Sequence, residues 1–379
     1  MTAPSAHEQQ AALAGQFRFE IAHRYDKRTT SWLYRPLKCF MRLFFLSDIV
    51  VEGIPNLAGV PRGVPVILSS IHKSHLDYLL MGLAIYGALR TVPAIIGGKN
   101  LFHGLFKHLL PRLKGICLDR DRANPKNLRS RENLLYLSTF YDYLMEVLEQ
   151  GDMILIYPEA GRSYSGAIQP LSLGVFGIAK RALKEGHPAV AIVPAGITYD
   201  RVTEDDRFQR MDEYKSKGAQ EYRAYDKGAF MRQALLQPKG AVYIDFGAPL
   251  MVSDVRAMDQ LELELRTRMG ALARVTPVAL VSRALCGHAT RPLADVLSHI
   301  GADLDCIRQR SLPAGRDVLN REAAAVFNRA LPHLCRRLRL RDIIRIEGAG
   351  PAATIRACRS DVLQYYANTV SHLFDGPTA

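Results

Sequence analysis

Short apolar runs and amphipathic stretches alternate along the middle of the chain. Six runs rich in valine and isoleucine predict buried β-strands, because continuous apolar runs of about four to eight residues are typical of strands covered on both faces. The predicted strands are residues 64–70, 91–97, 115–119, 152–157, 189–198 and 241–246, and the predicted helices are residues 75–89, 101–110, 127–149 and 171–185. This alternation predicts an α/β fold, with a mostly buried mixed sheet flanked by helices.

The N-terminal residues depart from this pattern. Residues 1–30 are polar and predict a loosely held lead-in helix. In residues 32–46, aromatic and leucine side chains alternate with Arg35, Lys38 and Arg42, a combination that suits a helix lying in a membrane interface. A core-facing helix with a solvated basic edge would show the same pattern, so both interpretations stay open.

Two other parts of the chain differ in composition from the α/β region. Residues 200–239 carry many charges, including Glu204-Asp205-Asp206-Arg207, and predict a surface excursion. After Ser253 the pattern is helical throughout, with a basic stripe at residues 336–341. The sequence thus predicts an N-terminal helical or interfacial segment (1–48), an α/β domain (49–252) and an all-helical C-terminal region (253–379).

The charge of the chain favours anionic partners. Its 379 residues include 50 Lys and Arg against 37 Asp and Glu, which gives a net charge of +13. Phosphorylated substrates, an anionic membrane surface and nucleic acid all fit such an excess. No helix-turn-helix, zinc-finger, basic-zipper or RNA-recognition signature accompanies it, so we expect no nucleic acid partner.

Cysteine usage and apolar run lengths bear on location. The six cysteines lie far apart and form no C-x-x-C pair, which favours reduced thiols in the cytoplasm. No basic-then-apolar secretory signal opens the sequence. No stretch approaches the roughly 20 apolar residues that a spanning helix needs. We therefore expect a soluble or monotopic cytoplasmic protein.

A histidine and an aspartate in the segment His72-Lys73-Ser74-His75-Leu76-Asp77 follow the first predicted strand. They can form a general-base pair, which an alcohol needs to attack an acyl carbonyl near neutral pH. A regular helix would place positions 72 and 77 about 140° apart, so we expect His72 in the turn and Asp77 in the first helical turn. Ser74 and Asp77 also fit a helix capping box, in which Asp77 would only satisfy a backbone donor.

Arginines follow two other predicted strands. Arg120 ends the third apolar run, and Arg162 follows the fourth. Ligands of α/β sheets bind outside the carboxyl ends of the strands, and a planar guanidinium suits phosphate. Taken singly, each arginine also reads as an ordinary surface residue. Their joint placement indicates a phosphorylated alcohol, activated by a histidine base.

Four histidines lie close together in the sequence: His72, His75, His103 and His108. Zinc needs three or four converging ligands, and no H-E-x-x-H motif occurs. We therefore expect no metal site.

Four blocks resemble the glycerolipid acyltransferases, and specifically the glycerol-3-phosphate O-acyltransferase family. In the family's order they are His72-x-x-x-x-Asp77, Gly115-Ile116-Cys117-Leu118-Asp119-Arg120, Glu159-Ala160-Gly161-Arg162-Ser163 and Val193-Pro194-Ala195. Residues 275–281 and 365–373 are similar to C-terminal elements of this family and argue against the shorter lysophosphatidate acyltransferases. The resemblance extends over residues 50–374 and does not include the long N-terminal region of the larger bacterial members.

Three positions differ from the family pattern. Ala160 replaces the usual first glycine of the third block, and Tyr164 stands where an arginine often follows. Asp119 precedes Arg120 where an apolar residue is usual, and a carboxylate there weakens anion binding unless it points away. These differences concern the acyl acceptor more than the reaction class.

The resemblance implies acyl transfer from acyl-CoA or acyl-ACP to the sn-1 hydroxyl of glycerol 3-phosphate, giving lysophosphatidate for phospholipid biosynthesis. His72 would be the general base, and Asp77 would orient it. The implied substrate-binding residues are Lys73, Arg120, Glu159, Gly161, Arg162 and Ser163, with the arginines on the phosphate and Glu159 orienting the loop. No cofactor is required, because the thioester arrives activated. Residues 101–110 are a candidate wall of the acyl groove or membrane contact, and equally an amphipathic core helix.

Alternatives stay open for the acceptor and for catalysis itself. The acceptor could be dihydroxyacetone phosphate or a lysophospholipid. The chain could also be a non-catalytic protein that binds anionic lipid with the same fold, although a binder needs no His72–Asp77 pair. We expect a location in the cytoplasm, peripheral on the inner face of the cell membrane.

Overall fold

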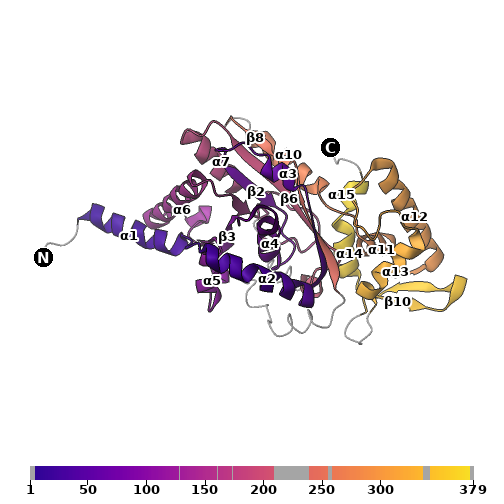
Figure 1. The fold of residues 1–379 in the computed structure, drawn as a ribbon. Helices are drawn as coiled ribbons and strands as arrows, with labels where there is room; N and C mark the ends of the chain where they lie inside the picture. The colour runs from indigo at the N-terminus through magenta and orange to yellow at the C-terminus, as the bar shows by residue number, and fades with distance from the viewer. Residues whose placement is uncertain are drawn as a thin grey trace.

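A computed structural model describes residues 5–375 except 128, 160, 173, 209–238, 255–257 and 336–341. Within these ranges, an eight-stranded sheet lies at the centre with helices on both faces, and a mainly helical region follows beside it (Figure 1). The strand order is β1-β7-β6-β2-β5-β3-β4, with β8 paired to β6. This arrangement confirms the predicted α/β class.

All six predicted strands form, and two more join them. The predicted ones are β2 Val66–Ser70, β3 Ala94–Gly98, β4 Gly115–Leu118, β5 Ile154–Ile156, β6 Val190–Tyr199 and β7 Gly240–Phe246. The additional strands are β1 Leu46–Glu52, parallel to β7, and β8 Leu250–Val252, antiparallel to β6. The sequence does not predict β1, because the aromatic helix is expected to continue to residue 46, where β1 begins. It does not predict β8, because three residues are too few to form an apolar run.

Strand direction brings the candidate loops together. β2, β5, β3 and β4 run parallel in neighbouring positions, so their carboxyl ends meet at one edge of the sheet. β6 also runs parallel to β2, whereas β7 is antiparallel to β6. The sheet is therefore mixed, as predicted, and the residues that follow its parallel strands share one side of the molecule.

Alternate residues of the central strands pack against helices on opposite faces of the sheet. In β2, Leu68 packs in the cluster that includes α4 (Asp77–Leu89), whereas Ile67 packs in the cluster that includes α6 (Arg131–Glu149) and α7 (Gly174–Lys184). Both side chains are fully buried. Because successive residues of a strand point to opposite faces, helices on both sides require a continuous apolar run.

The predicted helices form with shifted ends, and one is interrupted. Helices α4, α6 and α7 correspond to the patterns at residues 75–89, 127–149 and 171–185. The prediction of one helix over residues 101–110 is wrong, because this stretch contains the end of a 3₁₀ turn (η1, Lys99–Leu101) and the start of α5 (Phe106–Arg112). Gly104 lies between them with a φ of +54°, which a right-handed helix cannot accommodate.

Two N-terminal helices cover different faces of the sheet. α1 (Ala6–Ile21) is not loosely held as predicted, since Phe17 and Ile21 are buried and Phe17 packs edge-on against Tyr136 of α6. α2 (Lys27–Phe44) buries Met41 but leaves Trp32 75% exposed, so a core contact accounts for only one of its sides. The interfacial interpretation of the other side remains a prediction. Of the helices in the described ranges, α2 included, none has the length and apolarity to cross a bilayer.

The C-terminal region is helical, as predicted, but it also contains a small sheet. Its helices are α10 Met258–Ala271, α11 Pro277–Leu285, α12 Leu293–Arg310, α13 Ala323–Leu334, α14 Ser360–Asn368 and α15 Ser371–Phe374. Three antiparallel strands, β9 Thr290–Pro292, β10 Ile344–Glu347 and β11 Thr354–Ala357, make the prediction of helix throughout wrong. They are short and contain arginines, so they produce no apolar run. The basic stripe at residues 336–341 lies outside the described residues.

The C-terminal region and the central sheet share one hydrophobic cluster. Ile197 of β6, Leu280 of α11 and Tyr366 of α14 are all buried members of it. Short connections complete the described structure: α3 Ile54–Ala58, η2 Pro125–Asn127, η3 Asp205–Arg207 and η6 Gly350–Ala352. Since apolar packing is continuous across the two regions, the helices after β8 support the sheet directly.

The packing of α1 makes a stability prediction with an internal control. Phe17 is 2% exposed and Phe19, on the same helix, is 70% exposed. We expect Phe17→Ala to lower the free energy of unfolding by about 3–5 kcal/mol, the usual range for removing a buried aromatic side chain. Phe19→Ala should change it by less than about 1 kcal/mol. Urea unfolding followed by circular dichroism measures both, and equal effects would mean that α1 is not anchored through Phe17.

Candidate active site

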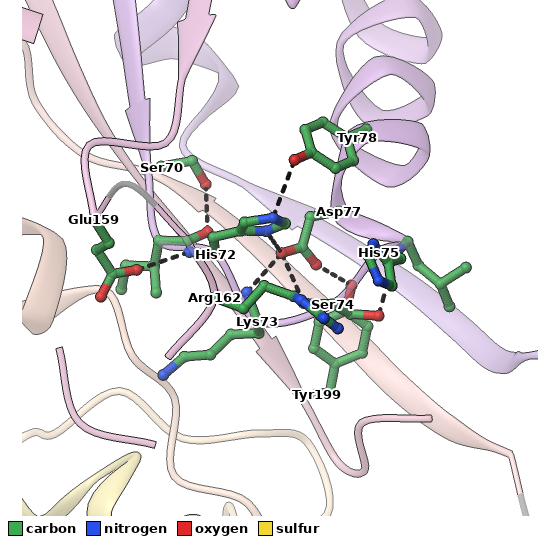
Figure 2. Close-up of polar contacts among 12 residues, drawn as sticks. Ser70, His72, Lys73, Ser74, His75, Asp77, Tyr78, Glu159, Arg162 and Tyr199 are labelled. Atoms are coloured by element: carbon green, nitrogen blue, oxygen red, sulfur yellow. Dashed lines mark hydrogen bonds and ion pairs between the residues drawn. The ribbon is translucent and has the colours of Figure 1, made fainter. Parts of the chain in front are cut away.

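A tight turn between β2 and α4 holds the predicted base pair. His72 lies two residues after β2 and is 4% exposed, and Asp77 is the first residue of α4 and fully buried. Nδ1 of His72 lies 2.8 Å from Oδ2 of Asp77 (Figure 2). An ionised carboxylate only accepts, so this contact places a proton on Nδ1 and leaves the lone pair of Nε2 on the other side of the ring. The prediction that His72 lies in the turn and Asp77 in the first helical turn is confirmed.

Three more donors surround the carboxylate of Asp77. Its Oδ2 accepts the backbone N–H groups of Lys73 (2.7 Å) and Ser74 (3.0 Å), and its Oδ1 accepts the hydroxyl of Tyr199 (2.5 Å). Burial, followed by the charge of Asp77, raises the pKa of Tyr199 well above its usual value, so this phenol stays a donor. These contacts fix the carboxylate beside the imidazole.

The capping interpretation of the same segment is partly right. Leu76, not Ser74, is the N-cap of α4, and it makes no side-chain capping hydrogen bond. The prediction of Ser74 as N-cap is therefore wrong. Asp77 nevertheless satisfies backbone donors of the turn, as a capping carboxylate does, while it also holds the imidazole. The two roles of Asp77 coexist because its two oxygens have several acceptor sites.

Two tyrosines enclose the other side of His72. The hydroxyl of Tyr78 lies 3.1 Å from Nε2, and the ring of Tyr157 lies over the imidazole at 4.4 Å between centroids (Figure 2 for Tyr78). Burial raises the pKa of Tyr157 well above its usual value, and within the described residues its buried hydroxyl has no hydrogen-bond partner. The sequence analysis predicts neither tyrosine as a site residue, although Tyr78 directly follows Asp77 and Tyr157 stands two positions before Glu159.

The loop after β5 clamps the histidine through its backbone. Oε2 of Glu159 accepts the N–H of His72 (3.0 Å), while Oε1 accepts the N–H of Gln169 (2.8 Å). The N–H of Ser163 donates in turn to the carbonyl oxygen of His72 (3.3 Å), and its hydroxyl donates to the carbonyl oxygen of Ala167 (2.6 Å). Glu159 and Ser163 therefore hold the loop and the turn in register.

Arg162 is buried beside the turn. Its Nη1 lies 3.2 Å from Oε1 of Glu204, and both side chains are almost completely inaccessible. Glu204 also accepts the hydroxyl of Ser74 (2.8 Å) and the N–H of His75 (2.9 Å). Burial raises the pKa of Glu204, and the positive charge of Arg162 opposes this shift. Glu204 thus connects Arg162 to the turn that carries His72 and Asp77.

Glu204 belongs to a charged segment that the sequence analysis predicts to be exposed on the surface. The prediction of a surface excursion is wrong for residues 200–208, where Glu204 and Asp205 are buried. The charges pair internally, because Arg201 binds Asp205 (3.0 Å) as Arg162 binds Glu204. Tyr366 of α14 adds its hydroxyl, which donates to Asp205 (2.9 Å) and accepts the N–H of Val202 (2.9 Å). Residues 209–238 lie outside the described ranges.

Lys73 of the first family block and Gly161 of the third are also predicted to bind substrate. Lys73 is buried and its Nζ donates to the carbonyl oxygen of Gly166 (2.7 Å), away from the imidazole (Figure 2). Burial lowers the pKa of Lys73. Gly161 leaves open space where a side chain would begin, and Ala160 lies outside the described residues.

Arg120 is exposed at the end of β4, at the same edge of the sheet as His72. Its guanidinium lies over Gly98, where an added Cβ would come within 3.4 Å of Nε. The neighbouring carboxylate of Asp119 binds Lys99 (2.9 Å) and accepts the N–H of Asp121 (3.2 Å). These contacts direct the charge of Asp119 into its own loop and toward Lys99.

An apolar cavity of about 320 Å³ opens beside the base pair. Tyr78 and His75 line it near the turn, and α2, α4, β3 and α5 supply its walls. Part of the wall comes from the stretch predicted as a groove wall: Leu101, Phe102, His103, Phe106 and Leu110. Tyr78 lines the cavity, and its hydroxyl lies 3.1 Å from Nε2 of His72, so a single residue connects the cavity with the base pair.

Comparisons with known proteins agree with the four blocks. Residues 49–198 match the family described as Acyltransferase. The glycerol-3-phosphate acyltransferase of Alteromonas mediterranea is 24% identical over 401 residues, which cover 98% of this chain and 47% of that protein. The mitochondrial glycerol-3-phosphate acyltransferase 1 of Bos taurus is 29% identical over 179 residues, 47% of this chain and 21% of that protein. The solved 1-acyl-sn-glycerophosphate (LPA) acyltransferase of Thermotoga maritima is 17% identical with a TM-score of 0.38, covering 69% of this chain and 95% of that one.

The family match and the two glycerol-3-phosphate acyltransferases confirm the family resemblance drawn from the sequence blocks. The matched residues 49–198 contain the turn of His72 and Asp77, Arg120 and the loop of Glu159 to Ser163. The chain spans about half the length of the Alteromonas protein and about a fifth of the bovine one.

The buried pair of Arg162 and Glu204 makes a prediction about stability. Arg162→Leu leaves Glu204 buried without its counter-charge, so we expect a loss of about 3–5 kcal/mol in the free energy of unfolding. The double variant Arg162→Leu with Glu204→Leu removes both charges and should recover much of this loss, as replaced buried pairs do. Urea unfolding of both single variants and the double variant measures the coupling. Additive losses would show that the two side chains do not interact as a pair.

Proposed function

Because residues 49–198 form a domain of the acyltransferase family, we propose that this chain transfers an acyl group from acyl-CoA or acyl-ACP to the sn-1 hydroxyl of glycerol 3-phosphate, giving lysophosphatidate. The observation that carries the proposal is the His72–Asp77 pair, whose second nitrogen contacts Tyr78, a residue that lines an apolar cavity. An imidazole base beside an apolar chain site is what esterification with a fatty acyl thioester requires.

The proposed reaction uses His72 as base and then as acid. Nε2 takes the proton of the acceptor hydroxyl while the oxygen attacks the thioester carbonyl, and the imidazolium is stabilised by Asp77. The tetrahedral intermediate collapses as the C–S bond breaks, and the leaving thiolate takes the proton from Nε2. The products are the ester and the free thiol, and the reaction as written needs no metal or prosthetic group.

The cavity is the proposed site of the acyl chain. Its lining is mainly apolar, with Leu33 and Leu37 of α2 facing Leu83 of α4 and Phe106 of α5 across it. Burial of each methylene there contributes about 0.8 kcal/mol. The chain end of the thioester can lie between these helices while its carbonyl remains near His72.

Arg120 is the proposed direct contact of the acceptor phosphate. It is exposed, lies at the carboxyl ends of the parallel strands and carries a fork suited to phosphate oxygens. Arg162 is buried, and its Nη1 is bound to Glu204, so we assign it a less direct part in phosphate binding than Arg120. We assign Lys73, Glu159, Gly161 and Ser163 to the loops that shape the acceptor site, with Glu159 holding His72.

The proposed working location is an anionic membrane surface, on the cytoplasmic side of the cell membrane. Five large apolar residues are exposed on helix α2 and at the start of α5: Trp32, Phe40, Leu43, Leu105 and Phe106. The basic residues Arg35 and Arg42 lie on α2 between and beside them. Both helices also line the apolar cavity, so a lipid product could pass directly between cavity and bilayer.

The function is tested by thiol release from palmitoyl-CoA with and without glycerol 3-phosphate. We expect acceptor-dependent release that falls at least about 100-fold in His72→Ala, the usual contribution of a general base. His288→Ala, an exposed histidine of the C-terminal region, is the matched control and should keep full activity. Circular dichroism checks that the His72 variant remains folded.

Different outcomes separate the alternatives. Release with dihydroxyacetone phosphate or lysophosphatidate but not with glycerol 3-phosphate would change the acceptor and keep the reaction. Release that survives His72→Ala would remove His72 as the base. Flotation with anionic liposomes without thiol release from either acyl-CoA or acyl-ACP would favour the non-catalytic lipid binder.

The acyl-chain site makes a prediction about chain length. Gly82 of α4 lines the cavity, and a Cβ placed there meets no other atom within 4 Å. Gly82→Leu should therefore fill part of the cavity and lower kcat/KM for palmitoyl-CoA by about fourfold for each methylene kept out. Decanoyl-CoA should be affected much less. Gly301→Leu in α12, where added atoms also meet nothing within 4 Å, is the matched control. Equal losses for both donors would place the acyl chain elsewhere.

A further inference from the structure

Both ring nitrogens of His72 have partners in this structure. Asp77 accepts at Nδ1 over 2.8 Å, and the hydroxyl of Tyr78 lies 3.1 Å from Nε2. Since the carboxylate of Asp77 can only accept, the proton between the two residues belongs to Nδ1, which makes Nε2 the acceptor and the hydroxyl of Tyr78 the donor. An imidazole nitrogen has one lone pair in the ring plane, so it accepts one strong hydrogen bond at a time. The atom that must receive the substrate proton is therefore already bound.

Tyr78 is placed to hold this contact and to release it. It is the second residue of α4, half-buried, and its ring packs edge-on against His72 at 5.1 Å between centroids. A second edge-on contact, with Tyr157 at 5.0 Å, also holds the ring, and Tyr157 in turn packs against His72. The same ring lines the apolar cavity. Tyr78 thus lines the proposed acyl site, and its hydroxyl is hydrogen-bonded to Nε2 of His72, the atom proposed as the base.

We propose that Tyr78 is a specificity-determining residue whose hydroxyl takes the place of the acceptor hydroxyl on Nε2 until the acceptor displaces it. This inference rests on the proposed function of the same site. A phosphorylated alcohol can displace Tyr78 because its phosphate is bound separately and holds its hydroxyl at Nε2 in high effective concentration. Water has no second anchor and competes poorly with the tethered phenol.

The consequence is protection of the thioester from hydrolysis. In that side reaction, Nε2 would take a proton from water, the hydroxide oxygen would attack the carbonyl, and the C–S bond would break to give a free fatty acid and a thiol. With Tyr78 on Nε2, a bound donor meets no activated water while the acceptor site is vacant. The hydrogen bond from Tyr78 to Nε2 then suppresses hydrolysis, while displacement of Tyr78 by the acceptor permits acyl transfer.

The test compares Tyr78→Phe with Tyr141→Phe. Tyr141 is a half-buried tyrosine of α6 that does not line the cavity, whereas Tyr78 lines the cavity and contacts His72. Tyr78→Phe should raise thiol release from palmitoyl-CoA in the absence of acceptor by about threefold to tenfold, the range set by one net hydrogen bond. Tyr141→Phe should leave acceptor-free release unchanged. Transfer to glycerol 3-phosphate should persist in Tyr78→Phe with an equal or lower acceptor KM, because no hydroxyl has to be displaced.

Two results would overturn the inference. Unchanged acceptor-free release in Tyr78→Phe would show that its hydroxyl does not keep water from the base. A fall in kcat for transfer with no rise in hydrolysis would show that Tyr78 orients His72 instead of reserving Nε2. Thermal unfolding of both variants checks that the exchange of tyrosine for phenylalanine leaves the fold intact.

A second readout does not depend on turnover. Diethyl pyrocarbonate acylates a free imidazole nitrogen, and peptide mass spectrometry follows the modification at His72. Tyr78→Phe should increase this rate relative to both the unaltered chain and Tyr141→Phe, and an equal rate would overturn the inference. If the unaltered chain releases no thiol with any donor and acceptor but Tyr78→Phe still exposes His72, the proposed function fails and the occupation of Nε2 by Tyr78 stands.

Discussion

A fully buried carboxylate governs the centre of this molecule. Removing an isolated carboxylate from water costs several kcal/mol, so donors must surround it. Asp77 obtains them from the imidazole of His72, from two backbone N–H groups of its own turn and from the hydroxyl of Tyr199. The two backbone groups can reach it only because the chain turns tightly between β2 and α4. The constraint that satisfies the charge therefore also sets the orientation of the histidine ring.

The sheet could be predicted from sequence because its physical signal is local. Helices on both faces demand apolar side chains in both directions, so β2 to β7 appear as uninterrupted Val- and Ile-rich runs. Strands of the small C-terminal sheet lack this signal: β9, for example, has the sequence Thr290-Arg291-Pro292 and is exposed at both ends. The break near Gly104 was also missed, because a positive φ leaves no mark on hydrophobic periodicity.

The site was predictable where its partners are close in sequence. His72 and Asp77 stand five positions apart and form the pair that their spacing suggested. Glu204 was hidden because a run of charged residues looks like a solvated loop, whereas its ion pair comes from Arg162, 42 positions away. The same pairing explains why Arg162, read as a phosphate ligand, lies buried against a carboxylate. Long-range partners of this kind follow from the fold and not from any single motif.

The contact of Tyr366 with the segment beside Glu204 has a consequence for the timing of synthesis. Tyr366 bonds to Asp205 and Val202, and the neighbouring Glu204 bonds to Ser74 in the turn that carries His72 and Asp77. A ribosome adds about 5–20 residues per second, so the roughly 290 residues between the turn and this tyrosine take about 15–60 s to make. During that interval the turn exists without its last polar support. Completion of the site is thereby tied to the end of translation, and a nascent chain lacks part of the polar network of the site until its last residues are made.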